Sequence, residues 1–113
     1  MKEIKAVIRP SKLLEVTQEL HDMEGLPGVT VHEIKGFGKG RGNRGEGEAG
    51  SELVELVARV QLELVVADEM VDQVVDVIQR YAHTGNTGDG KIFVTTVDDV
   101  VKIRTNERGA GAI

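Results

Sequence analysis

The sequence predicts a single α+β domain made of two β-α-β units, and two observations support this fold class. Residues 4–35 show a strand pattern, a helical pattern and a second strand pattern, and residues 60–97 repeat that order. The chain has 113 residues, the length of one domain. Two such units predict a ferredoxin-like domain over residues 1–113, with a four-stranded antiparallel sheet and both helices on one face.

The first unit begins with a strand over residues 4–9, rich in branched side chains. Pro10 ends this strand because proline has no N–H to donate to a ladder. Apolar residues then recur at helical spacing over 13–23, and a Gly-Leu-Pro-Gly sequence ends the helix. Strand composition resumes over 29–35, which completes the unit.

The second unit begins with alternating apolar and polar residues over 60–66. Asp68, a good helix N-cap residue, precedes apolar residues at helical spacing over 71–82. A dense turn sequence over 85–90 separates this helix from a strand over 91–97. We expect a short further strand and a Gly/Ala-rich tail in residues 100–113.

A long glycine-rich loop joins the two units. Seven of the 15 residues from Gly36 to Gly50 are glycine, with basic residues early and acidic residues late. Loops this long inside a compact domain are commonly functional. Residues 52–57 are expected to form a short returning strand or a turn.

The predicted fold and the chain length indicate self-association. Helices on one face leave the other face of the sheet uncovered, and a chain this short buries only roughly two-thirds of its unfolded surface. No Cys is present, so no disulfide compensates. We therefore expect three or two copies to pack against one another.

Composition excludes several classes of protein. A net charge of -5 and 3% aromatic residues argue against a nucleic-acid binder. The absence of Cys excludes thiolate zinc sites, and His21, His32 and His83 occur singly, so no metal site is expected. No apolar run approaches the about 20 residues of a membrane span. The sequence predicts a cytoplasmic protein that does not insert into membranes.

The stretch Thr84–Val94 carries the strongest chemical signal. Its clustered glycines allow backbone N–H groups to line up as an anion nest, and Lys91 adds a positive charge. It is not a P-loop, because Ile92 stands where Ser or Thr should hold magnesium and a strand follows where a helix should. The alternative is a tight turn with a surface lysine.

Two further cations occur in the strand expected over residues 100–104. Lys102 and Arg104 are two residues apart, so on a strand they point to the same face. Like charges on one face favour an anion between them. The alternative is a solvated strand face.

Four stretches resemble, in order and spacing, the nitrogen regulatory PII signal-transduction protein family: Met1–Pro10, Val31–Gly38, Thr84–Val94 and Lys102–Thr105. Members of this family are homotrimers of ferredoxin-like subunits that bind ATP or ADP in clefts between subunits. A long loop, the T-loop, projects from each subunit and contacts partner proteins. The resemblance implies a homotrimer with a T-loop at about residues 38–55.

The resemblance also implies which residues bind the nucleotide. Thr30 is expected near the adenine, and the glycine-rich turn with Lys91 at the phosphates. Lys102, where the family usually has Arg, and Arg104 are expected to reach across from the neighbouring subunit. The expected nucleotide-binding residues are Thr30, Gly36, Phe37, Gly38, Lys39, Val65, Gly88, Asp89, Gly90, Lys91, Lys102 and Arg104.

The T-loop departs from the family pattern. The family often carries a Tyr there that is uridylylated, whereas this chain has Glu52 or Leu53 at that position and no Tyr in the loop, which excludes uridylylation there. Ser51 resembles a phosphorylated context, although a loop serine is usually unmodified. The residues expected to bind the partner are Arg41, Arg44, Glu46, Glu48, Ser51 and Glu52.

The family's 2-oxoglutarate site is also altered. A Gln completes the shell of a magnesium ion on the ATP phosphates, and a Lys pairs with the ligand carboxylate; here Gly40 and Arg59 stand at those positions. Glycine offers no side-chain ligand, so the metal shell is incomplete. This argues against 2-oxoglutarate sensing through magnesium, while Arg59 retains the geometry to clamp a carboxylate effector.

The leading hypothesis is a non-enzymatic, trimeric regulator that senses adenine nucleotides. Nucleotide binding would change the order of the T-loop and so control a partner: an enzyme, a transcription regulator or, by analogy, a membrane transporter. A second hypothesis is a small ferredoxin-like enzyme acting on phosphate compounds, with Lys91 and Arg104 as electrophiles and Asp89 as the only candidate base. A third is an RNA-binding module using the Arg-Gly sequence of residues 40–45.

Overall fold

The structure, a computed structural model, describes residues 1–38, 43–44 and 54–113. The helices are α1 (Leu13–His21) and α2 (Val71–Ala82), each preceded by a 3-10 turn, Pro10–Lys12 and Asp68–Met70, and a third 3-10 turn spans Ala110–Ala112. The strands are β1 (Lys2–Ile8), β2 (Thr30–Gly36), β3 (Asn43–Arg44), β4 (Val54–Glu55), β5 (Val57–Val66) and β6 (Lys91–Thr96).

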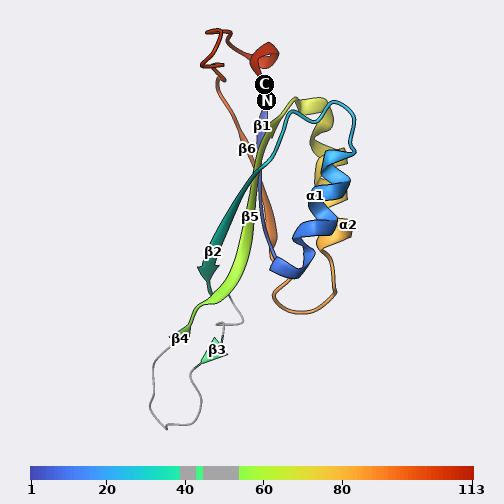
Figure 1. Ribbon diagram of the computed structural model, residues 1–113, viewed down its shortest axis with the longest axis vertical. Helices are drawn as coiled ribbons and strands as arrows, with labels where there is room; N and C mark the ends of the chain where they lie inside the picture. The colour runs from blue at the N-terminus through green and yellow to red at the C-terminus, as the bar shows by residue number, and fades with distance from the viewer. Residues whose placement is uncertain (39–42, 45–53) are drawn as a thin grey trace.

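The main sheet has four strands in the order β2-β5-β1-β6, with every neighbouring pair antiparallel. Both helices lie on one side of this sheet (Figure 1). The short strands β3 and β4 pair with each other in a second sheet. The structure therefore confirms the predicted ferredoxin-like α+β fold.

The hydrophobic core lies between the sheet and the helices. Alternate residues of β1 and β5 point to the helices, and the ladder places them opposite one another, as Ile4 opposite Leu64 and Ala6 opposite Leu62. From the helices, Leu20 of α1 and Ile78 of α2 are completely buried against them. The apolar residues at helical spacing and those at alternate strand positions thus pack together in one core.

The opposite face of the sheet carries no helix. The register places Phe93 of β6 beside Lys5 of β1, on the face opposite Ile4 and Ala6. Phe93 is 50% exposed in the single subunit. This face therefore combines charged side chains with a half-exposed aromatic ring.

The strand expected over residues 100–104 is not formed. Val101 makes only an isolated bridge with Arg108, and the chain reverses between them. The carbonyl of Lys102 accepts hydrogen bonds from the N–H groups of Thr105 and Asn106, and the Lys102 N–H donates to Glu107. Lys102 and Arg104 therefore belong to a tight turn and do not alternate along a strand.

Asp68 was also expected to cap a helix through its side chain, and this expectation is wrong. Ala67 is the N-cap residue of the 3-10 turn before α2, and no side chain bonds to this cap. The carboxylate of Asp68 instead accepts a hydrogen bond from the N-terminal ammonium of Met1 at 2.8 Å. This contact lowers the pKa of Asp68.

Two leucines of α1 provide a matched test of the core. Leu20→Ala should lower the free energy of unfolding by about 2–5 kcal/mol, because Leu20 is completely buried and its truncation leaves a cavity. Leu14→Ala, in the same helix, should change it by less than about 0.5 kcal/mol, because Leu14 is 67% exposed. Chemical denaturation at one fixed protein concentration measures both, and equal losses would contradict this placement of the core.

Candidate functional site

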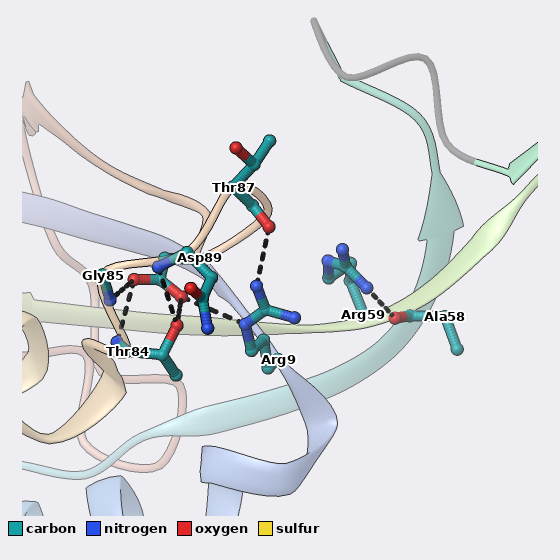
Figure 2. Close-up of polar contacts among 8 residues, drawn as sticks. Arg9, Ala58, Arg59, Thr84, Gly85, Thr87 and Asp89 are labelled. Carbon is teal, nitrogen blue, oxygen red and sulfur yellow. Dashed lines mark hydrogen bonds and ion pairs between the residues drawn. The ribbon is translucent and has the colours of Figure 1, made fainter.

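The connection between α2 and β6 is a turn, here called the glycine turn (residues 84–90), that is organised by one carboxylate. Oδ2 of Asp89 accepts hydrogen bonds from the backbone N–H groups of Thr84 and Gly85, both at 2.8 Å. Its Oδ1 accepts from the Thr84 hydroxyl and, at 3.0 Å, from Nε of Arg9. Figure 2 shows these contacts converging on Asp89. The turn is therefore closed around a side chain.

These contacts hold the pKa of Asp89 far below its ordinary value. The hydrogen bond from the Thr84 hydroxyl is the largest cause, followed by the Thr84 backbone N–H, with Gly85 and Arg9 adding smaller contributions. Asp89 is consequently ionised at neutral pH and fully engaged in holding the turn. A carboxylate in this state is a poor general base.

Arg9 binds the glycine turn from the end of β1. Besides Nε on Asp89, its Nη2 donates to the carbonyl oxygen of Thr87 at 2.7 Å. The guanidinium thus bonds the residue before and the residue after Gly88. The planar fork of arginine suits this bridging role, because its donors have a fixed relative geometry.

Gly88 and Gly90 have backbone conformations that favour glycine, with φ of +98° and +97°. A Cβ on Gly88 would lie 3.0 Å from Nη2 of Arg59 and 3.3 Å from Nη2 of Arg9. A Cβ on Gly90 would overlap the carbonyl oxygen of Val7. The turn therefore approaches both β1 and two guanidinium groups closely.

The three cations around the turn differ in their partners. Arg9 is paired with Asp89. Arg59, on β5, donates from Nη1 only to the carbonyl oxygen of Ala58, at 2.8 Å. In the part of the chain that the structure describes, neither Arg59 nor Lys91 forms an ion pair with a carboxylate. Two cations beside a glycine-lined turn form a site suited to an anion.

Thr30, which is expected near the adenine, and Val65, also of the nucleotide set, lie elsewhere on the subunit. They line a hollow of about 340 Å³ together with the C-terminal Ala112 and Ile113. Asp89 and Gly90 of the glycine turn border a separate hollow of about 230 Å³, which includes Lys91. The two hollows share no lining residue. One subunit therefore does not bring Thr30 and the residues expected at the phosphates into one of these cavities.

The other expected residues are dispersed. Gly36 ends β2 and pairs with Val57, two residues before Arg59, so this end of β2 lies on the Arg59 side of the sheet. Lys102 and Arg104 lie in the C-terminal segment, at the end of the sheet opposite the glycine turn (Figure 1). Their expected contact with phosphates across a subunit boundary stays a prediction.

Most of the expected partner-binding residues lie outside the described residues. These are Arg41, Glu46, Glu48, Ser51 and Glu52, together with Lys39 of the nucleotide set and Gly40 of the metal shell. Arg44 lies in β3, paired through its backbone with Val54 of β4.

Arg9 is the site residue that sequence reasoning missed. It was interpreted only as the last residue of the first strand, and its partner Asp89 lies 80 positions later. The antiparallel pairing of β1 with β6 places Val7 opposite Lys91. The residue that follows β1 must then lie beside the turn that precedes β6, and this consequence of the expected topology would have identified Arg9.

Metal-ligand clusters and membrane-spanning helices are both absent from residues 1–38, 43–44 and 54–113. No group of three or more His, Asp or Glu side chains gathers there as metal ligands. No helix there has the length and apolar composition needed to cross a membrane.

Fold and site together define a class of protein: a small ferredoxin-like domain that presents a cationic, glycine-lined turn beside an edge strand. The family model described as "Nitrogen regulatory protein P-II" matches residues 1–107. Relatives with the same description are 46% identical in Azospirillum brasilense, 44% in Rhodospirillum rubrum and 43% in Pasteurella multocida, each over 113 residues that span all of both chains. The chain belongs to the nitrogen regulatory P-II family of signal-transduction proteins.

The close approach of Gly90 to β1 predicts a steric penalty that Gly109 does not share. Both have positive φ, which L side chains rarely adopt, so Gly90→Ala and Gly109→Ala should each cost about 1–3 kcal/mol of backbone strain. Gly90→Ala should lose more, because its Cβ would meet the Val7 carbonyl, whereas the space at Gly109 is open. Chemical denaturation of the two variants measures the free energy of unfolding. Equal losses would contradict the close approach of Gly90 to the Val7 carbonyl.

The lowered pKa of Asp89 predicts a specific pH dependence of stability. A carboxyl whose pKa is lowered on folding stabilises the protein above its unfolded pKa of about 3.9, and this contribution is lost as pH falls toward the folded pKa. Asp89→Asn should therefore destabilise most at neutral pH, and the difference from the wild type should shrink below about pH 4.

Denaturation at several pH values between 7 and 2.5 would measure this difference. Asp76→Asn is the control, because Asp76 is exposed on α2 and makes no hydrogen bond or ion pair with the residues described. A difference between wild type and Asp89→Asn that is the same at every pH would refute the role assigned to the ionised carboxylate.

Proposed function

We propose that this P-II family member binds ATP or ADP and that nucleotide binding controls a partner protein through the T-loop (residues 38–55). The proposal rests on one observation, the cationic side chains that lie around Gly88. The guanidinium of Arg9, just after β1, and that of Arg59, on β5, approach this glycine, and Lys91 follows the turn directly. In a chain of net charge -5, such a cluster is most simply explained by an anionic ligand.

The nucleotide site is proposed to lie between subunits of a homotrimer. The hollow at Thr30 and Val65 and the hollow at Lys91 are separate within one subunit, so a neighbour is needed to bring the two kinds of surface together. The uncovered sheet face with its half-exposed Phe93 supplies a surface for that packing. In this arrangement Lys102 and Arg104 would contribute to the neighbour's cleft.

Control of the T-loop follows from where its base lies. Gly36 at the end of β2 pairs with Val57 at the start of β5, and Arg59 follows two residues later. A phosphate or carboxylate that binds Arg59 therefore acts on the strand from which the loop emerges. We propose that this contact orders the loop for its partner, a transporter, an enzyme or a transcription regulator.

The residue types around the turn favour anion binding without a dedicated metal ligand. Gly40 has no side chain to complete a magnesium shell, so 2-oxoglutarate sensing through magnesium is not proposed. Arg59 supplies a guanidinium for a carboxylate effector. We place the protein in the cytoplasm and propose no nucleic-acid ligand, since its charge is acidic overall.

Catalysis on a phosphate compound is the weaker alternative. Among the described residues Asp89 is the only candidate base near the cations, and it is ionised, accepts several hydrogen bonds and is paired with Arg9. These hydrogen bonds outweigh the desolvation that raises its pKa, so the pKa lies below its ordinary value and far from the range useful for proton transfer. We propose that the protein binds its nucleotide without turning it over.

Calorimetric titration with ATP and ADP, each with and without Mg²⁺, tests the proposal. ATP should bind, its affinity should fall at least about tenfold in Lys91→Gln, and 2-oxoglutarate added to the ATP-magnesium complex should give no heat. Lys12→Gln is the matched control, because Lys12 lies in the 3-10 turn before α1 and faces Glu15. Absence of ATP binding would overturn the nucleotide assignment, and analytical ultracentrifugation separately tests the trimer.

A further inference from the structure

The glycine turn is held by Arg9 through a bridge that spans a single residue. The guanidinium bonds the Thr87 carbonyl with Nη2 and the Asp89 carboxylate with Nε, so its two contacts lie on either side of Gly88. Both side chains of the ion pair are mostly buried, at 26% exposure for Arg9 and 23% for Asp89. Partial burial and fixed donor geometry make this bridge more rigid than a surface ion pair.

The bridge also fixes where the Gly88 peptide can lie. Nη2 of Arg9 would be 3.3 Å from a Cβ on Gly88, so the guanidinium occupies the space beside this glycine. Gly88 has φ of +98°, and the described residues contain no acceptor for its backbone N–H. An N–H that is held in place and not consumed within the protein can donate to a bound anion.

Arg9 differs in this respect from the other two cations. Its charge is balanced by the adjacent Asp89, whereas Arg59 and Lys91 make no ion pair with a described carboxylate. The attraction for an anion therefore comes mainly from Arg59 and Lys91. Arg9 instead fixes the conformation of the glycine turn through its bonds to Thr87 and Asp89.

We propose that Arg9 is a positioning residue that presets the backbone of Thr87–Gly90 for binding the phosphate chain of a nucleotide. This inference rests on the proposed function and assigns a role at that site to a residue that follows β1 and is remote in the sequence. Lysine cannot replace Arg9, because a single ammonium lacks the planar fork that bonds Thr87 and Asp89 from one fixed group. An Arg9→Lys substitution would keep the positive charge but lose the fixed arrangement of the two hydrogen bonds to Thr87 and Asp89.

Two substitutions separate geometry from charge. Arg9→Lys keeps the charge and Arg9→Gln removes it. Both should weaken ATP and inorganic tripolyphosphate binding by about ten- to a hundredfold, the range expected for charge-assisted hydrogen bonds, and leave adenosine binding unchanged. Lys12→Gln is the control, because Lys12 lies in the 3-10 turn before α1 and faces Glu15 at 3.9 Å. This variant should bind all three probes as the wild type does.

The alternative outcomes are distinct. Wild-type affinity in Arg9→Lys with weak binding in Arg9→Gln would show that only the charge matters and would overturn the proposal. An equal loss of adenosine and ATP binding would also overturn it, because a positioning role at the phosphates spares the base.

Hydrogen exchange on the ligand-free protein tests the bridge independently of any nucleotide. The amides of residues 85–90 should exchange faster in Arg9→Lys than in the wild type, while those of β1 and β5 stay protected. Unchanged exchange in the turn would refute the role of Arg9. If the wild type bound neither ATP nor tripolyphosphate, the proposed function would fail, and the exchange result would still decide whether Arg9 holds the turn.

Discussion

The ion pair between Arg9 and Asp89 is the contact on which the geometry of the site depends. It joins the end of β1 to the turn before β6, 80 residues away, next to the ladder that pairs Val7 with Lys91. The ladder fixes the strands but ends where the turn begins. Beyond that point the carboxylate of Asp89 accepts hydrogen bonds from backbone N–H groups of the turn. The guanidinium of Arg9 connects this carboxylate to the end of β1.

The two faces of the sheet differ, and this difference is the physical basis for proposing a site between subunits. On the helical side, alternating residues of β1 and β5 are buried against α1 and α2. On the other side, Phe93 and the charged residues beside it have no cover from the residues described. In the proposed homotrimer another copy would cover that face, and a site formed there would draw on more than one subunit.

The fold class was predictable because it depends on local periodicity, and the chain shows that periodicity clearly in both units. The errors had two causes: at Asp68 and Arg9 a distant partner outweighed the local pattern, and at Lys102 a turn without glycine was not recognised. Asp68 has the composition of a cap but binds the N-terminal ammonium. The sequence around Lys102 alternates like a strand, yet the chain reverses at Asn106, whose positive φ has no glycine to signal it. Arg9 was missed for the same reason as the Asp68 contact, since its partners are remote in the sequence.

Arg9 and Arg59 have different roles at the proposed site, and this difference relates the site to the loop. Arg9 is neutralised where it stands, so it can hold the turn without needing a ligand. Among the described residues Arg59 is bonded only to a neighbouring carbonyl, at the end of β5 where Gly36 pairs with Val57. In the proposed function, an anion at Gly88 would meet a rigid turn on one side and, on the other, a guanidinium on the strand that follows the loop. The rigid side would make binding specific, and the Arg59 side would transmit binding to the loop.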